Sequence, residues 1–116
     1  MGKKVLIIDD QPDILEVLTE IIEILGHEVV AISSGYNLDK KFQTNDFDLV
    51  VTDYQMPDMT GIDIARKIKI KYPGTKVYII SGYHQILPED KMAEYGVSGL
   101  LDKPFEIEEL KGILNA

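Results

Sequence analysis

The stretch Val5-Leu6-Ile7-Ile8-Asp9-Asp10 is an apolar run that stops on two acids, and the pattern recurs along the chain. Three later runs also stop on a polar residue: Leu49-Val50-Val51-Thr52 on Asp53, Val77-Tyr78-Ile79-Ile80 on Ser81, and Leu100-Leu101-Asp102 on Lys103-Pro104. Short runs rich in β-branched and large apolar residues are typical of strands covered on both faces. The sequence therefore predicts buried strands with polar residues at their carboxyl ends.

Helical patterns separate the expected strands. We predict strands at Val5–Ile8, Glu28–Ile32, Phe47–Thr52, Lys76–Ile80 and Ser98–Asp102. We predict helices at Pro12–Leu25, Gly35–Thr44, from Thr60-Gly61-Ile62-Asp63 to Tyr72-Pro73-Gly74, at Pro88–Tyr95 and at Glu106–Leu114. Alternation of strand and helix implies parallel strands joined by right-handed crossovers. We expect an α/β fold, a three-layer αβα sandwich with the flavodoxin-like strand order 2-1-3-4-5.

Length and composition favour a single domain over residues 1–116, with no output domain in this chain. The net charge of -8 disfavours direct contact with nucleic acids or anionic membranes. The chain has no cysteine, and its first residues contain neither a signal peptide nor a membrane span. We therefore expect a cytoplasmic protein.

The expected strand order brings three acids together. With strand 1 beside strand 3, Asp9 and Asp10 lie near Asp53, because ligands and polar groups gather beyond the carboxyl ends of parallel strands. Three neighbouring carboxylates raise one another's pKa, so a positive group is needed among them. Mg²⁺ is the natural candidate, since it binds through one or two carboxylates and phosphate oxygens.

The same edge carries the groups that phosphoryl chemistry needs. A carboxylate beside a metal can attack phosphorus and become an aspartyl phosphate, and Asp53 at the end of the inner strand is the candidate. Lys103 would pair with one phosphoryl oxygen, and the Ser81 hydroxyl would donate to another. Taken singly, these residues have plainer interpretations as turn or surface groups, and Asp10 or Gln11 as a helix cap. The coincidence of four strand ends favours a functional site.

From Lys3 onward the chain resembles the receiver domain of two-component response regulators. The motifs are Asp9-Asp10, the segment from Asp53 through Gln55, Met56 and Pro57 to Gly61, Ser81-Gly82, and Lys103-Pro104-Phe105. The resemblance implies that Asp53 accepts a phosphoryl group from a histidine kinase or histidine phosphotransfer protein. It also implies that Asp9, Asp10, Asp53 and the backbone carbonyl of Gln55 hold Mg²⁺.

The resemblance implies further roles around the site. Ser81 is expected to move toward the phosphoryl group, and the peptide bond before Pro104 to be cis. Gln55 and Tyr83 stand where the family tunes hydrolysis of the acyl phosphate. The first helix is expected to dock the phosphodonor. The fourth helix, fifth strand and fifth helix would face a downstream protein target or a fused output domain.

One position departs from the family pattern. Leu100 stands three residues before Lys103, where the family usually has Tyr or Phe. Our hypothesis is that Leu100 transmits the signal by packing, or that Tyr83 takes over part of this role. A different functional class, a Mg²⁺-dependent phosphohydrolase with an aspartyl-phosphate intermediate, needs a second acid where Gln55 stands, which weakens it. A third alternative is an interaction module that is not phosphorylated.

Overall fold

A five-stranded parallel sheet lies at the centre of the computed structural model, which describes residues 2–57, 59–82 and 88–115. The strands are β1 (Lys4–Ile8), β2 (Glu28–Ile32), β3 (Leu49–Asp53), β4 (Lys76–Ser81) and β5 (Gly99–Asp102). Their order is β2-β1-β3-β4-β5, and each neighbouring pair is parallel. The predicted topology is confirmed.

The helices are α1 (Pro12–Ile24), a 3-10 turn η1 (Gly35–Asn37), α2 (Leu38–Thr44), α3 (Gly61–Lys71), α4 (Glu89–Tyr95) and α5 (Ile107–Leu114). The second predicted helix is wrong in its first turn, because the Ser34 hydroxyl accepts a hydrogen bond from Tyr36 N at 3.2 Å and opens a 3-10 turn instead. The capping box is present, since Thr60 N donates to Asp63 Oδ2 and Asp63 N to Thr60 Oγ1. The third strand begins at Leu49, not at Phe47.

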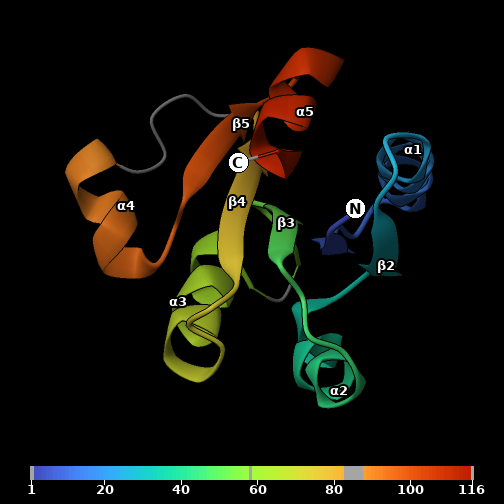
Figure 1. The fold of residues 1–116 in the computed structure, drawn as a ribbon. Coiled ribbons are helices and arrows are strands. Elements are labelled where there is room, and N and C mark those ends of the chain that lie inside the picture. The colour runs from blue at the N-terminus through green and yellow to red at the C-terminus, as the bar shows by residue number, and fades with distance from the viewer. Residues whose placement is uncertain (1, 58, 83–87, 116) are drawn as a thin grey trace.

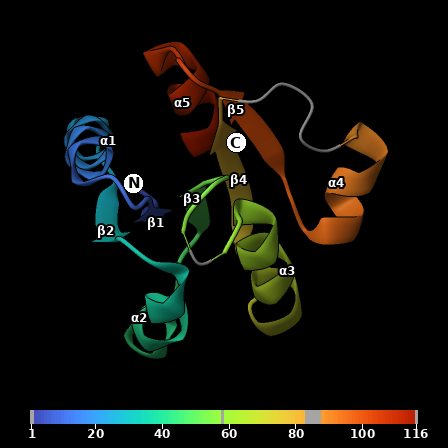
Figure 2. The ribbon, with the colours of Figure 1, turned by 180° about the vertical axis from the view of Figure 1, so that it is seen from behind.

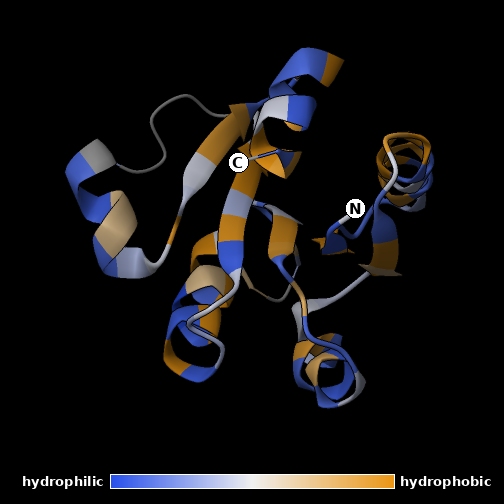
Figure 3. Cartoon of the chain, viewed as in Figure 1, coloured by the Kyte–Doolittle hydropathy of each residue, from blue (hydrophilic) through white to orange (hydrophobic). Residues whose placement is uncertain are grey.

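Helices cover both faces of the sheet (Figures 1 and 2). Alternate strand residues point to opposite layers: Ile7 packs in the cluster that contains α1 and α5 residues, and Ile8 in the cluster that contains α2 and α3 residues. Figure 3 shows mainly hydrophobic strands and helices of mixed character. β3 is buried throughout, whereas the edge strand β2 is half exposed, so the expected two-sided cover holds only for the inner strands.

The contact between α3 and α4 depends on a glycine. Gly96 follows α4 with φ of 79°, and a Cβ there would lie 2.9 Å from Ala65 O of α3. Glycine both adopts this left-handed conformation and permits the close approach. The Lys69 ammonium donates to Ala93 O and Glu94 O at the end of α4. No helix in the described part of the chain is long and apolar enough to cross a membrane.

Candidate functional site

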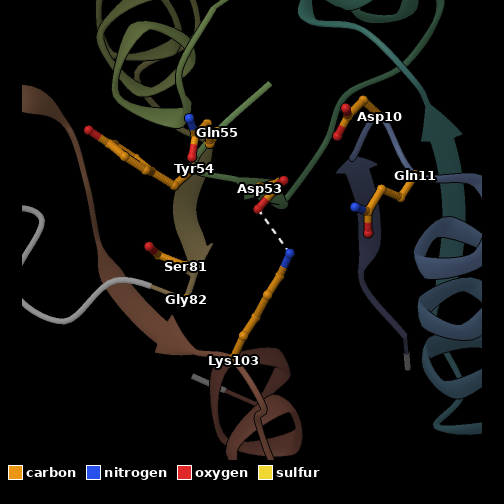
Figure 4. A pocket seen from close by; sticks show the side chains of 8 residues that line it. All are labelled: Asp10, Gln11, Asp53, Tyr54, Gln55, Ser81, Gly82 and Lys103. Carbon is orange, nitrogen blue, oxygen red and sulfur yellow. Dashed lines mark hydrogen bonds and ion pairs between the residues drawn. The ribbon is translucent and has the colours of Figure 1, made fainter. Parts of the chain in front are cut away.

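The carboxyl ends of β1, β3, β4 and β5 surround a crevice of about 350 Å³ (Figure 4). The residues that line it are Asp10, Gln11, Asp53, Tyr54, Gln55, Ser81, Gly82 and Lys103. They come from the ends of separate strands because parallel strands all finish at the same edge of the sheet. The polar residues that end the apolar runs therefore meet in one place.

Three aspartates form the acidic side of the crevice. Asp9, Asp10 and Asp53 each place one carboxylate oxygen within 4.8 Å of the others. Asp9 and Asp53 are buried, and Asp10 is exposed. Asp9 Oδ1 accepts a hydrogen bond from Gln11 N at 2.9 Å. Gln11 is the N-cap residue of α1 but its side chain makes no capping bond, so the helix-cap alternative is wrong for Gln11.

The surroundings of Asp9 disfavour its ionised form. Burial raises the pKa of Asp9 above its ordinary value of 3.8, and the negative charges of Asp53 and Asp10 raise it further. The hydrogen bond from Gln11 N and the Lys103 ammonium oppose this shift of the pKa. Clustered carboxylate oxygens of this kind suit a hard divalent cation, which would remove the repulsion among them. The donor set therefore fits Mg²⁺.

Lys103 provides the positive charge on the opposite side. Its Nζ lies 3.1 Å from Asp53 Oδ1, and Figure 4 shows the side chain extending from the end of β5 to that carboxylate. Lys103 N donates to Ser81 O at 2.8 Å, which ties the ends of β4 and β5 together. Ser81 is itself buried, 4% exposed, beside the crevice. The Lys103 ammonium therefore contacts Asp53, whereas Figure 4 shows the Ser81 hydroxyl directed away from that carboxylate.

The remaining expected residues lie around this centre. Gln55 is exposed and forms an isolated antiparallel bridge with Thr60. The Lys103–Pro104 peptide is cis, as the family resemblance implied. Leu100 is half-buried and packs against the core cluster that contains α3 residues. It is paired in register with Ile79 of β4. Tyr83, the other residue of the switching hypothesis, lies outside the described residues.

Sequence reasoning overlooked three residues beside Asp53. Tyr54 lines the crevice, and Figure 4 shows its ring directed away from Asp53. Thr52 is fully buried, with its Oγ1 donating to Asp53 O at 3.1 Å. Gly61 N donates to Tyr54 O at 2.7 Å. The sequence held a signal for two of them: the Thr52 hydroxyl in an apolar strand, and Gly61 directly after the capping Thr60.

A family model described as the response regulator receiver domain matches residues 5–115. The chain belongs to this family. Receiver domains are phosphoacceptor signalling domains of two-component systems, and they generally bind Mg²⁺ at an acidic pocket. Membership of this family counts against an enzyme of another class, whereas an interaction module that keeps the fold without being phosphorylated stays an alternative.

Related proteins and structures place the domain in context. The receiver domain is 33% identical over 110 residues to the DNA-binding transcriptional regulator NtrC of Azospirillum brasilense, an alignment that covers 95% of this chain and 23% of that regulator. A response regulator receiver domain protein from Clostridium thermocellum has a TM-score of 0.88 at 33% identity, with 97% of this chain and 91% of that chain covered.

A third comparison carries a ligand. The response regulator protein TrrA from Thermotoga maritima, crystallised in complex with Mg²⁺-BeF, has a TM-score of 0.85 at 28% identity. The match covers 97% of this receiver domain and 96% of TrrA. The two chains therefore share one architecture over nearly their whole lengths.

Proposed function

We propose that this receiver domain is a phosphorylation switch in which Asp53 accepts a phosphoryl group from a histidine kinase or histidine phosphotransfer protein. One observation carries the proposal: Asp53 has a carboxylate oxygen within 4.8 Å of those of Asp9 and Asp10, and its Oδ1 lies 3.1 Å from the Lys103 ammonium. A phosphoryl group on Asp53 would lie between the Lys103 ammonium and a metal ion held by the acidic cluster. In this proposal residues 1–116 form one receiver domain.

The metal would be Mg²⁺. Asp9, Asp10 and Asp53 would hold it through carboxylate oxygens, and Gln55 through its backbone carbonyl. Bound there, the ion would neutralise the carboxylates and the charge on phosphoryl oxygens. The Mg²⁺-BeF complex of the similar protein TrrA supports this assignment.

The chain's own groups would act on the phosphoryl group in distinct ways. A carboxylate oxygen of Asp53 attacks the phosphorus of a phosphohistidine, a P–O bond forms, and the P–N bond to the imidazole breaks. The leaving imidazole nitrogen takes up a proton. Lys103 Nζ pairs with one phosphoryl oxygen, and the Ser81 hydroxyl donates to another.

A groove beside the crevice suits the phosphodonor. It has a volume of about 450 Å³ and is lined by Ile14, Val17, Leu18, Lys103, Pro104 and Phe105. Val17 on α1 is 52% exposed, so apolar surface is available there. Lys103 lines both the groove and the crevice, so a partner docked on α1 would lie beside the crevice that contains Asp53.

The signal would leave through the face built from α4, β5 and α5, and Leu100 lies on β5. Phosphorylation adds a charge of about -1.5 to -2, and the readout is a shift between conformations with different partner affinities. The partner is a downstream protein target or a fused output domain. We propose that Leu100 acts by packing against the core, since it contacts the cluster that contains α3.

Covalent labelling tests the proposal. The protein is incubated with Mg²⁺ and acetyl phosphate, and intact mass is compared for wild type, Asp53→Asn and the control Asp46→Asn, an exposed aspartate before β3. We expect one phosphoryl adduct in wild type and in Asp46→Asn and none in Asp53→Asn. An adduct that survives in Asp53→Asn contradicts the assignment. Repeated turnover of phosphate esters would instead favour the phosphohydrolase.

The lifetime of the adduct tests the flanking residues. Gln55 lines the crevice, so its side chain lies where water approaches Asp53. We propose that Gln55→Ala and Tyr83→Ala change the rate at which the adduct is lost. Equal dephosphorylation rates in both variants and in wild type would remove these residues from the site.

A further inference from the structure

We infer that Thr52 and Gly61 are positioning residues for phosphoryl transfer at Asp53, because together they hold the peptide group that joins Asp53 to Tyr54. The inference rests on the proposed function, since it assigns the support of the same nucleophile. Neither residue touches the substrate in this scheme. Both act through the backbone of Asp53.

This peptide group is held at both ends. Its carbonyl oxygen, Asp53 O, accepts a hydrogen bond from Thr52 Oγ1 at 3.1 Å. Its amide, Tyr54 N, donates to Ile80 O of β4 at 2.9 Å. The two bonds determine the orientation of the peptide plane, and that plane sets the backbone dihedrals on either side of it.

The first residue of α3, Gly61, restrains the chain directly after Asp53. Gly61 N donates to Tyr54 O at 2.7 Å, so the next peptide group is also anchored. A Cβ on residue 61 would lie 2.8 Å from Asp53 O and 3.2 Å from the Cα of Tyr54. Since both are backbone atoms, a side chain at this position requires the segment after Asp53 to move.

Asp53 needs this support because of its place in the sheet. The pairing of β3 with β1 ends at Thr52, opposite Ile8, so Asp53 lies beyond the ladder on that side. Its carboxylate is also within 4.8 Å of two others, which repel it when ionised. A nucleophile displaced by about 1 Å loses about a hundredfold in rate, so the anchored peptide protects the reaction geometry.

Thr52 is difficult to explain by stability alone. It is fully buried in a strand whose neighbours Val50 and Val51 are apolar. Valine has nearly the same shape, and burying a hydroxyl is unfavourable unless it is hydrogen-bonded. The bond that the hydroxyl makes goes to the next residue along the chain and joins no distant elements. A purely structural role therefore predicts little benefit from threonine here.

The experiment compares Thr52→Val and Thr52→Ser with the control Thr75→Val. The Thr75 hydroxyl also donates to a backbone carbonyl, Phe47 O at 2.8 Å, at the opposite end of the sheet. The rate of phosphorylation by acetyl phosphate at saturating Mg²⁺, the Mg²⁺ dissociation constant and the urea midpoint are measured. We expect Thr52→Val to react about tenfold more slowly at an unlowered midpoint, and Thr52→Ser to restore most of the rate. Thr75→Val should react like wild type.

Gly61→Ala provides a second measurement. Its Cβ must displace the backbone of Asp53, so we expect phosphorylation at least tenfold slower, again at saturating Mg²⁺. A wild-type phosphorylation rate in Thr52→Val or in Gly61→Ala would overturn the inference. A rate in Thr52→Ser as low as that in Thr52→Val would also overturn it. Each of these results would leave the proposed function intact. A wild type that forms no Asp53-dependent adduct would overturn the proposed function first.

Discussion

Two regions of the molecule use aspartate in opposite ways: the acidic crevice and the contact between α2 and α3. In the crevice Asp9 is 1% exposed and shares its surroundings with two other acids. Burial and the neighbouring charges raise its pKa. The ionised crevice therefore stores unfavourable energy in the folded protein.

Asp39 on α2 has the reverse surroundings. Its Oδ2 lies 2.9 Å from Lys67 Nζ and 3.2 Å from Lys71 Nζ on α3, and its Oδ1 accepts from Tyr72 Oη at 2.9 Å. The hydrogen bonds from Lys67 and Tyr72 lower the pKa of Asp39 from 3.8 to about 2. The hydrogen bond from Tyr72 Oη to Asp39 also raises the pKa of Tyr72.

The difference separates stability from function. At the α2–α3 contact the Asp39 carboxylate lies against two lysine ammoniums of α3, so its charge is compensated within the chain and the contact joins two helices. In the crevice three acids are set against one lysine in contact, Lys103. The imbalance costs stability, but it creates the capacity to bind a cation. Variants that alter one region at a time separate the two roles.

The largest expected effect comes from Mg²⁺. At about one hundred times its dissociation constant, a ligand that binds only the folded state adds about 2.7 kcal/mol to the free energy of unfolding. We expect this gain in wild type and in Asp39→Asn, and its loss in Asp9→Asn, in urea titrations at constant ionic strength. An equal gain in Asp9→Asn would show that the ion binds elsewhere.

The next effect tests the α2–α3 contact. The Phe42 ring stacks on Tyr72 with centroids 3.9 Å apart and meets Phe47 edge-on at 5.0 Å. Phe42→Ala should lower the free energy of unfolding by about 2 kcal/mol, less than for a fully buried ring because Phe42 is half-buried. Phosphorylation of Asp53 should proceed at the wild-type rate. A slower reaction in folded Phe42→Ala would show that the two regions are coupled.

A stabilising change is expected in the crevice. Asp9→Asn keeps an acceptor for Gln11 N but removes one charge, so without Mg²⁺ it should raise the free energy of unfolding by about 1 kcal/mol at neutral pH. Because the folded pKa of Asp9 is raised, the penalty in wild type is present at higher pH and is relieved as pH falls through that pKa toward 3.8. The gain from the variant should therefore shrink on acidification. A gain independent of pH would contradict the electrostatic cause.

The smallest effect has the opposite pH dependence. Asp39 is 38% exposed, so Asp39→Asn should lower the free energy of unfolding by less than about 1 kcal/mol. Its folded pKa is lowered, so the stabilisation is present above 3.8 and is lost as pH falls through about 2. Urea midpoints of the variant and wild type should converge over that range. Convergence already at neutral pH would exclude the ion pairs as its source.

Local pattern was enough for most of the fold. The apolar runs, the Thr60–Asp63 capping box and the stop at Gly96 predicted every strand and helix to within two residues, except for the 3-10 turn that Ser34 opens. α4 shows little hydrophobic character in Figure 3, and its predicted position depended on the glycine that ends it. Short-range periodicity and capping are properties of neighbouring residues, which a sequence displays directly.

The site was predictable in part. That polar residues end four strands is visible in the sequence, and strand order implies that Asp9 and Asp10 approach Asp53. The roles of Thr52 and Gly61 were not predictable. The distance of Gly61 from Asp53 O depends on how closely α3 packs against the end of β3, and the bond from Thr52 depends on the side-chain rotamer of a buried strand residue, neither of which residue spacing encodes.

The sequence by itself determined which chemical groups stand at the strand ends and, through alternation of strand and helix, that these ends share one edge of a parallel sheet. Only the tertiary structure decided which charges meet: Lys103 with Asp53 in the crevice, and Asp39 with Lys67 across two helices. The physical reason is the separation along the chain over which each kind of interaction acts. Backbone preferences act over a few residues, whereas ion pairs and close backbone contacts join segments that only packing brings within a few ångströms.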